Sequence, residues 1–276
     1  MRNWIAYKGN GTLNDFVILK DREGMLDLTP DVVQYLCDRR AGLGGDGVLR
    51  AVKAELIPEW TGDPSLWFMD YRNADGSIAE MCGNGLRVFV QFLISQGLIA
   101  PAEVEVATRA GLRTATPLGD GRISVSMGEV KIDYPELTVS LSDRRWPADR
   151  VNVGNPHAVV FLDFDDDIES LDLTVAPTWN PGRVFPHGTN IEFVEILGER
   201  HLKMRVYERG VGETMSCGTG VVAAATSHAA RMGLTDGSIA VDVRGGVLEV
   251  GLSGEITLTG EAIINGECSI AIPDYL

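Results

Sequence analysis

Two short motifs in the sequence each combine a cysteine with a pair of glycines. They read Met81-Cys-Gly-Asn-Gly85 and Ser216-Cys-Gly-Thr-Gly220, and each precedes an apolar, helix-like segment. A cysteine at the start of a helix lies at its positive end, where the thiol pKa falls and backbone N–H groups can hold an anion. The chemistry that these motifs indicate is therefore proton transfer by two thiols beside a bound carboxylate.

The two motifs belong to an internal repeat. Cysteines are more commonly small packing residues, but here the thiol, the glycines and the helix start all recur 135 residues apart, as does Arg109-Ala-Gly111 in Arg244-Gly-Gly246. A repeat of half the chain predicts two domains of one fold. We expect one domain, with Cys82, over residues 1–128 plus about 264–276, and a second, with Cys217, over residues 129–263.

Each half has the same order of expected elements. A strand is followed by a polar loop and then by a helix that ends at a glycine: strands 66–73 and 202–209, helices 86–96 and 221–232, glycines Gly97 and Gly233. More strands are expected at 103–108, 122–127, 239–243 and 255–259. The predicted class is α+β, with two pseudo-symmetric domains, each a mixed, mostly antiparallel sheet wrapped around a central helix. Segments 133–149 and 163–167 are expected to be connecting surface segments, with Asp165–Asp167 solvated.

A polar residue stands nine positions before each cysteine. Period-two alternation places Glu208 at the end of an otherwise apolar strand face, and Asn73 holds the same position before Cys82. The symmetric placement favours a shared cleft in which two helix N-termini hold one carboxylate. One thiolate would then remove an α-proton while the other thiol returns a proton to the opposite face. This chemistry requires neither a metal nor pyridoxal phosphate.

Composition excludes several classes of partner. The 276 residues contain 24 Lys and Arg against 39 Asp and Glu, a formal charge of -15 that opposes binding to nucleic acid or an anionic membrane. No apolar run reaches the roughly 18 residues that span a bilayer. The N-terminal segment lacks the pattern of an export signal, so a cytoplasmic location is expected. The four cysteines form no CxxC pair, which fits a reducing compartment, and we expect structural roles for Cys37 and Cys268.

The motifs together resemble those of the diaminopimelate epimerase family. The likeness runs nearly end to end and includes, besides both cysteine motifs, Gly11-Thr-Leu-Asn-Asp-Phe16, Asn73-Ala-Asp-Gly76, Gly154-Asn-Pro-His157, Gly188-Thr-Asn190 and Tyr207-Glu-Arg-Gly210. The resemblance implies a cofactor-independent isomerase, commonly a homodimer. Its reaction would convert LL-2,6-diaminopimelate to meso-diaminopimelate in lysine and peptidoglycan precursor synthesis.

The resemblance also implies roles for individual residues. Cys82 and Cys217 would be the acid/base pair, with His157 and Glu208 assisting at the reacting centre and Glu208 near the substrate ammonium. Backbone donors to the reacting carboxylate would come from Gly83, Asn84, Gly218 and Thr219. The remaining substrate contacts would come from Asn14, Asn73, Asn155, Asn190 and Arg209. Arg209 would take the distal carboxylate as a bidentate pair.

Two alternatives stay open at this point. A proline or hydroxyproline racemase of the same fold would use the same two thiols, although a small ring has no distal carboxylate for Arg209 to bind. A non-catalytic module could hold an amino-acid carboxylate at the two helix N-termini, although binding alone needs neither thiol.

Overall fold

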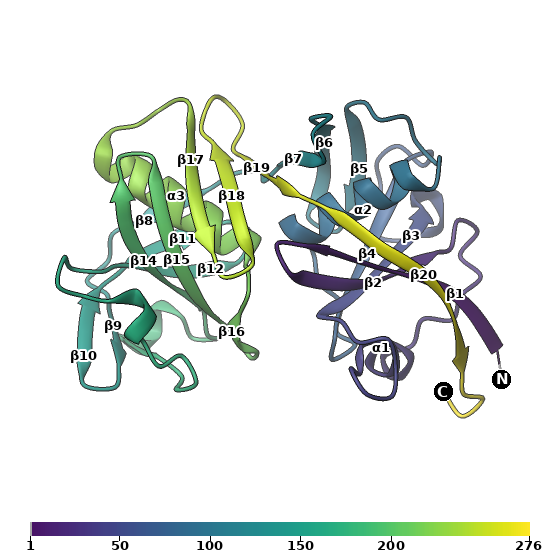
Figure 1. The fold of residues 1–276 in the computed structure, drawn as a ribbon, viewed down its shortest axis with the longest axis horizontal. Helices are drawn as coiled ribbons and strands as arrows, with labels where there is room; N and C mark the ends of the chain where they lie inside the picture. Colours follow the sequence, from purple (N-terminus) through teal and green to yellow (C-terminus); the bar gives the residue numbers. More distant parts are fainter. Residues whose placement is uncertain (1) are drawn as a thin grey trace. The chain divides into compact units, whose positions relative to one another are not determined.

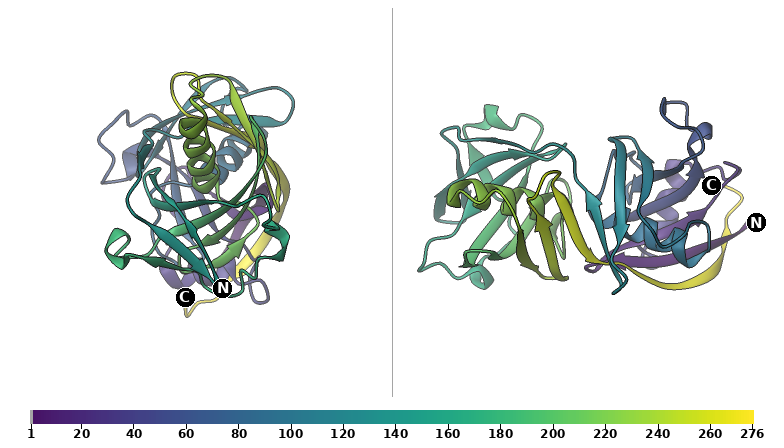
Figure 2. Two further views of the ribbon diagram at one scale, coloured as in Figure 1. Left: turned by 90° about the vertical axis from the view of Figure 1, so that its left-hand side faces the viewer. Right: turned by 90° about the horizontal axis from the view of Figure 1, so that it is seen from above.

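Each helix that follows a cysteine motif is the centre of its own unit in the computed structural model, which describes residues 2–276. The first unit holds the described chain up to Val125 together with Gly260–Leu276, and the second holds Ser126–Thr259. Helix α2 (Gly83–Ser95) lies in the first unit and α3 (Gly218–Met232) in the second (Figure 1). Most residues of both helices are buried, because strands of the same unit pack around them (Figure 2).

The first unit is a mixed sheet. Its strands are β1 (Arg2–Gly11), β2 (Asn14–Lys20), β3 (Gly47–Lys53), β4 (Trp67–Asn73), β5 (Val104–Thr108), β6 (Gly111–Pro117), β7 (Arg122–Ser126) and β20 (Ile263–Ile272). Parallel pairing joins β2 to β3 and β4 to β5, and the other pairs are antiparallel. The final strand, β20, pairs with β1. Helix α1 (Pro30–Cys37) begins at its N-cap Thr29, and a short 3-10 helix, η1, covers Ala54–Leu56.

The second unit repeats this plan and adds a separate sheet of three antiparallel strands, β9, β10 and β13. Its strands are β8 (Lys131–Asp133), β9 (Thr138–Leu141), β10 (Arg144–Pro147), β11 (Asp149–Asn152), β12 (Pro156–Phe161), β13 (Thr178–Asn180), β14 (Asn190–Gly198), β15 (His201–Glu208), β16 (Gly212–Thr214), β17 (Ser238–Val243), β18 (Gly246–Gly251) and β19 (Thr257–Glu261). Two 3-10 helices, η2 (Ile168–Ser170) and η3 (Gly182–Val184), interrupt it. Pairs β12–β14 and β15–β17 are parallel, and most others are antiparallel. The predicted α+β class, with a mixed sheet around a central helix in each unit, is confirmed.

The strand registers make the two units directly comparable. Phe16 lies opposite Gly47 in the parallel pair β2–β3, and His157 lies opposite Asn190 in the parallel pair β12–β14. The strand that follows each pair, β4 or β15, leads to the cysteine and its helix. Positions on these strands can therefore be matched between the units.

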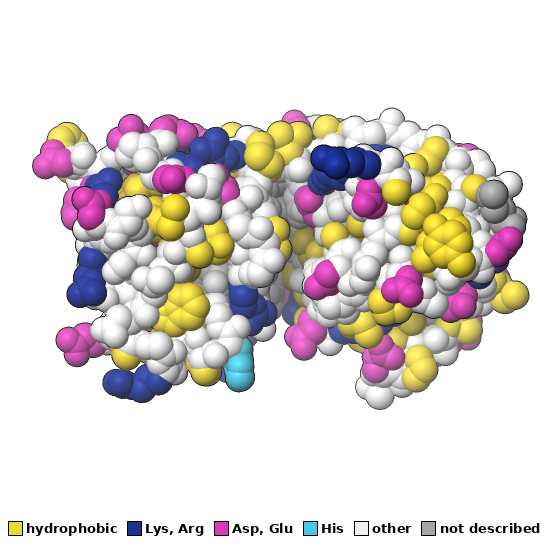
Figure 3. Space-filling view, turned by 90° about the horizontal axis from the view of Figure 1, so that it is seen from below, with side chains coloured by type: hydrophobic (Ala, Val, Ile, Leu, Met, Phe, Trp, Pro, Cys, Tyr) yellow, Lys and Arg dark blue, Asp and Glu magenta, His cyan; other side chains and the backbone are white. Residues whose placement is uncertain are grey.

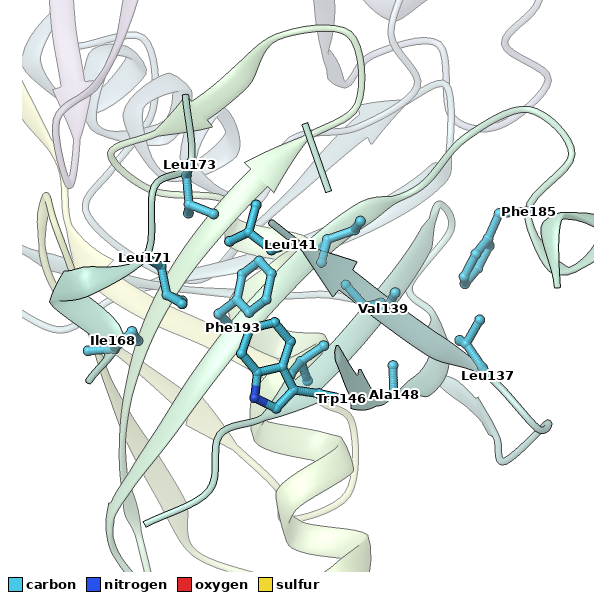
Figure 4. Close-up of a cluster of buried hydrophobic side chains, with 13 residues drawn as sticks. Leu137, Val139, Leu141, Trp146, Ala148, Ile168, Leu171, Leu173, Phe185 and Phe193 are labelled. Atoms are coloured by element: carbon cyan, nitrogen blue, oxygen red, sulfur yellow. The ribbon is translucent and has the colours of Figure 1, made fainter. Parts of the chain in front are cut away.

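The segment 133–149 differs from the prediction of a connecting surface segment. It forms β9, β10 and the start of β11, and its apolar residues belong to a buried cluster (Figure 4): Leu137, Val139, Leu141, Trp146 and Ala148. Alternation of apolar and polar residues at 137–141 buries one strand face. The prediction was wrong because the flanking Asp and Pro residues hid this short alternation.

The acidic run after β12 is solvated only in part. Asp165 and Asp167 are exposed, but Asp166 accepts a hydrogen bond from Nε1 of Trp146 at 2.6 Å and pairs with Arg144. Its carboxylate satisfies the indole N–H at the edge of the buried cluster. The expectation that the whole run is solvated was therefore wrong for Asp166.

Acidic and basic side chains are interspersed on the surface. On the face drawn in Figure 3, Lys and Arg side chains stand singly or in small groups among Asp and Glu and form no continuous basic surface. No helix within residues 2–276 is both long and apolar enough to cross a membrane.

Candidate active site

Cys82 is the N-cap of α2. Its backbone is extended (φ -143°, ψ 118°), and its carbonyl accepts the first helical hydrogen bond from the N–H of Leu86 at 2.8 Å. The N–H of Gly85 points to the Cys82 sulfur at 3.3 Å. The sulfur and the N–H groups from Gly83 onward share the positive end of the helix.

A chain of amide groups leads from the Cys82 sulfur into the interior. The sulfur lies 3.8 Å from Oδ1 of Asn14, and the same oxygen accepts a hydrogen bond from Nδ2 of Asn84 at 3.3 Å. Oδ1 of Asn84 in turn accepts one from Nη2 of Arg87 at 2.6 Å. Nδ2 of Asn14 also donates a hydrogen bond to Oδ2 of Asp46 at 2.7 Å. The structure thus brings the predicted residues Asn14 and Asn84 together at Cys82.

Arg87 is a fully buried guanidinium inside an apolar helix. Its described partners are neutral oxygens of Asn84, Thr12 and Glu261. Burial lowers the pKa of Arg87 to about 10, and the negative charge of a Cys82 thiolate opposes that change. The guanidinium therefore stays charged at neutral pH, and its field favours the thiolate form of Cys82.

Asn73 lies apart from this amide chain. It ends β4 and closes a turn, with its Nδ2 donating to Oγ of Ser77 at 3.0 Å and its N–H to the Ser77 carbonyl at 2.9 Å. Gly76 makes this turn possible because its φ of +86° suits glycine. Among the described contacts, Asn73 has none with Cys82, Asn14 or Asn84.

Cys217 is the N-cap of α3 and lies in an acidic environment. Its carbonyl accepts from the N–H of Val221 at 2.9 Å, and its sulfur lies 3.5 Å from Oγ1 of Thr219. Burial raises the pKa of the Cys217 thiol well above its usual value, and the carboxylates of Glu208 and Glu192 raise it further. Cys217 is therefore held as a neutral thiol, whereas the helix that Cys82 caps contains a buried cation.

Glu208 ends β15 next to Cys217. Its Oε1 accepts a hydrogen bond from Oγ1 of Thr214 at 2.5 Å. Loss of hydration raises the pKa of Glu208, and the nearby carboxylate of Glu192 adds to this rise, while hydrogen bonds from Thr214 and Cys217 oppose it. A carboxyl group with a raised pKa can exchange a proton at neutral pH more readily than an exposed one.

His157 and Asn155 form a second polar chain, on the sheet side of Cys217. Nε2 of His157 lies 2.9 Å from Oδ1 of Asn155, whose Nδ2 donates to Oγ1 of Thr219 at 3.3 Å. Nδ1 of His157 contacts Oε1 of Glu192 at 2.7 Å. No hydrogen bond joins His157 to Glu208 among the described residues.

The side chain of Asn190 holds the backbone of Arg209. Oδ1 of Asn190 accepts the N–H of Arg209 at 2.9 Å, which fixes the chain just after β15. The Arg209 side chain is exposed, passes over Gly188 and donates to the His187 carbonyl at 3.4 Å. Within residues 2–276 no carboxylate pairs with it, so its charge is available to an anionic ligand.

Sequence reasoning missed Arg87 and Glu192. Each is a single charged residue in an apolar run, Leu86-Arg-Val-Phe89 and Asn190-Ile-Glu-Phe193, and that interruption was the available signal. No three His, Cys, Asp or Glu side chains in the described part of the chain cluster in a way that could hold a metal ion.

The family is identified by its sequence model. The model described as diaminopimelate epimerase matches residues 6–132 and 150–264, which include both cysteine motifs. The chain belongs to the diaminopimelate epimerase family. A protein named diaminopimelate epimerase from Streptomyces coelicolor is 48% identical, with 97% of this chain and 96% of that protein covered. One from Corynebacterium glutamicum is 45% identical, with 93% and 94% covered.

Solved structures at low identity share the fold of this family member. A PhzF-family phenazine biosynthesis protein from Bacillus anthracis matches with a TM-score of 0.72 at 16% identity, covering 99% of this chain and 100% of that chain. A hydroxyproline epimerase from Agrobacterium vitis, solved with trans-4-hydroxy-L-proline bound, matches at 0.69 and 15% identity, covering 99% and 94%. At such identities the likeness concerns the fold alone.

Proposed function

We propose that this protein is an isomerase that converts LL-2,6-diaminopimelate to meso-diaminopimelate without a cofactor, in lysine and peptidoglycan precursor synthesis. Family membership and the names of relatives that match nearly the whole chain support the substrate. The observation that carries the chemistry is the repeated placement of a cysteine as the N-cap of a buried helix.

In the proposed mechanism the two thiols act on opposite faces of one α-carbon. One unit supplies Cys82 and the other Cys217, so each unit is an epimerase domain that contributes one acid/base group. The Arg87 cation favours a Cys82 thiolate that removes the α-proton, and the raised pKa of Cys217 favours a thiol that returns one. The roles exchange for the reverse reaction.

Backbone and side-chain donors would hold the substrate. N–H groups at the helix starts, from Gly83 and Asn84 and from Gly218 and Thr219, would bind the reacting carboxylate and stabilise the charge that develops on it. The substrate-binding site would also be lined by four asparagines: Asn14, Asn73, Asn155 and Asn190. Glu208 would lie near the substrate ammonium and His157 would support the reacting centre, while the exposed Arg209 guanidinium would bind the distal carboxylate.

A proline-type racemase is the second candidate, and it is not favoured. The hydroxyproline epimerase that shares the fold is only 15% identical, whereas relatives named diaminopimelate epimerase are 41% to 48% identical. The available charge of Arg209 fits a substrate with a second carboxylate better than a proline ring. A non-catalytic binding module would need neither thiol.

The proposal extends to assembly and location. It takes the enzyme to be a homodimer in the cytoplasm, and light scattering of the purified protein and cell fractionation test these two points.

A comparison of turnover between diaminopimelate and proline-type substrates tests the proposed reaction. We expect reduced protein without pyridoxal phosphate to interconvert LL- and meso-diaminopimelate and to leave the stereoisomers of proline and hydroxyproline unchanged. Turnover of a proline isomer with none of diaminopimelate would replace the substrate, and binding without turnover would support the module.

A further inference from the structure

Glu192 is a buried carboxylate that the proposed mechanism does not use. It lies in the middle of β14 and is 0% exposed. Its Oε1 contacts Nδ1 of His157 at 2.7 Å, and its Oε2 has no hydrogen-bond partner among the described residues. An ionised carboxylate without water needs an opposite charge beside it. The only described group that can supply this charge in direct contact is the His157 ring.

Both ring nitrogens of His157 have oxygen partners. Both ring nitrogens face acceptors, Oε1 of Glu192 at 2.7 Å and Oδ1 of Asn155 at 2.9 Å. The amide of Asn155 is oriented this way because its Nδ2 donates to Oγ1 of Thr219. An ionised carboxylate and an amide oxygen only accept hydrogen bonds, and an imidazolium is the form of the ring that can donate to both.

The chain continues to the reactive sulfur. Oγ1 of Thr219 accepts from Asn155 at 3.3 Å and lies 3.5 Å from the Cys217 sulfur. The Thr219 oxygen receives a hydrogen bond from Asn155, and its own hydrogen can therefore be donated to the sulfur. A neutral His157 with hydrogen on Nδ1 alone would turn the Asn155 amide over, and the Thr219 hydrogen would then go to Asn155.

Comparison of the two units shows that the fold does not require this ion pair. A Cβ added to Gly85 would lie 3.2 Å from Cδ2 of Leu49, and one added to Gly220 would lie 2.7 Å from Oε1 of Glu192. Leu49 and Glu192 are therefore matched positions beneath the two cysteine helices. The matched register also pairs Phe16 with His157. The first unit packs apolar side chains where the second has the ion pair.

We propose that Glu192 is a positioning residue for Cys217: it keeps His157 as an imidazolium and, through Asn155 and Thr219, directs a hydroxyl hydrogen to the Cys217 sulfur. The inference rests on the proposed function in that Cys217 transfers a proton. A hydrogen bond to the sulfur stabilises the thiolate that forms when Cys217 gives up its proton. The other charged group that faces Cys217 is Glu208, whose hydrogen bond to Thr214 is separate from this chain.

The test uses Glu192→Gln, which keeps the shape of the side chain and removes its charge. The matched control is Glu195→Gln, a partly exposed carboxylate on the same strand opposite Lys203. Nitrogen NMR of the histidine rings, assigned with His157→Gln, should show His157 doubly protonated at neutral pH in the wild type and in the control. In Glu192→Gln it should be singly protonated.

Kinetics provide the second measurement. With diaminopimelate, Glu192→Gln should lower kcat about tenfold to 100-fold, the loss expected for a hydrogen bond to a charged group, with KM changed less than about threefold. Glu192→Asp, which keeps the charge, should retain the imidazolium signal and recover part of kcat.

The outcomes separate the two proposals. A neutral His157 in the wild type, an imidazolium that persists in Glu192→Gln, or an unchanged kcat in that variant would overturn the role of Glu192. The NMR measurement of the wild type, assigned with His157→Gln, needs neither Glu192→Gln nor substrate, so a neutral His157 would overturn the proposal even if Glu192→Gln fails to fold. Wild-type protein that shows the imidazolium but no turnover of diaminopimelate would contradict the proposed function alone.

Discussion

Nη2 of Arg87 lies 2.6 Å from Oδ1 of Asn84, and both side chains are fully buried. This contact fixes the Asn84 amide, whose Nδ2 then donates to Asn14 beside the Cys82 sulfur. The matched position on α3 is Val222, and the arginine of that helix, Arg231, lies in its last turn. The two thiols consequently have environments of opposite charge.

We expect Arg87→Met to weaken both the fold and the Cys82 thiolate. Hydrogen bonds from Arg87 to oxygens of Asn84, Thr12 and Glu261 are lost, which should lower the free energy of unfolding by about 2 kcal/mol or more. In the folded variant, the ultraviolet thiolate absorbance that Cys82→Ser removes should be smaller at neutral pH than in the wild type. Arg87→Lys is the control, because it keeps the charge. An unchanged Cys82 thiolate signal in folded Arg87→Met would show that the guanidinium does not favour the thiolate.

We expect Arg209 to strengthen the binding of the substrate. Its guanidinium is exposed and has no carboxylate partner within residues 2–276. Loss of a bidentate pair with the distal carboxylate should raise KM for diaminopimelate at least about tenfold in Arg209→Met, with little change in stability. Arg145→Met, another exposed arginine whose side chain contacts Ser140, is the control. An unchanged KM in Arg209→Met would remove this residue from the binding site.

We expect the buried Cys37 thiol to make the free energy of unfolding depend on pH. Burial raises the pKa of its thiol to about 12 from an ordinary value near 9. The folded protein thus holds this proton more tightly than the unfolded chain. The resulting stabilisation is complete below about pH 9 and is lost as the pH rises toward 12, by at most about 4 kcal/mol.

Urea unfolding of the wild type and of Cys37→Ala at several pH values measures this contribution. The stability advantage of the wild type should shrink as the pH rises above about 9, because the Cys37 thiol then ionises in the unfolded chain while the folded protein still holds the proton. Cys268→Ala, at a half-buried cysteine, is the control. A difference between wild type and Cys37→Ala that stays constant from about pH 8 to pH 11 would contradict the raised pKa.

The repeat made much of the fold predictable. Two copies of one motif led to two units of one class, and the glycine after each apolar helix predicted where it ends: Gly97 and Gly233 both have positive φ. The prediction failed for 133–149, where a two-residue alternation buries Leu137 and Val139 between Asp and Pro residues. The Asp and Pro content of that segment indicated a surface connection, although its alternation of apolar and polar residues indicated a strand.

The chemical environment of each thiol was less predictable. Both cysteines could be placed at helix starts from the motifs, but Arg87 and Glu192 lie in apolar runs whose buried face cannot be known without the strand register and helix packing. The contact between Asn14 and Cys82 joins residues 68 positions apart, and that between His157 and Glu192 joins residues 35 apart. Such contacts depend on which strands are neighbours, and local patterns do not determine this.

The central claim is that both thiols move protons at one α-carbon, and deuterium exchange tests it most directly. Reduced protein free of pyridoxal phosphate would be incubated with LL-diaminopimelate in D2O, as wild type, Cys82→Ala, Cys217→Ala and the control Cys268→Ala. We expect wild type and control to form meso-diaminopimelate with deuterium at the inverted α-carbon. Each active-site variant should lose at least about 100-fold of this activity, the scale of acid/base catalysis. Epimerisation that survives the loss of either Cys82 or Cys217, or inversion without deuterium uptake, would contradict the account.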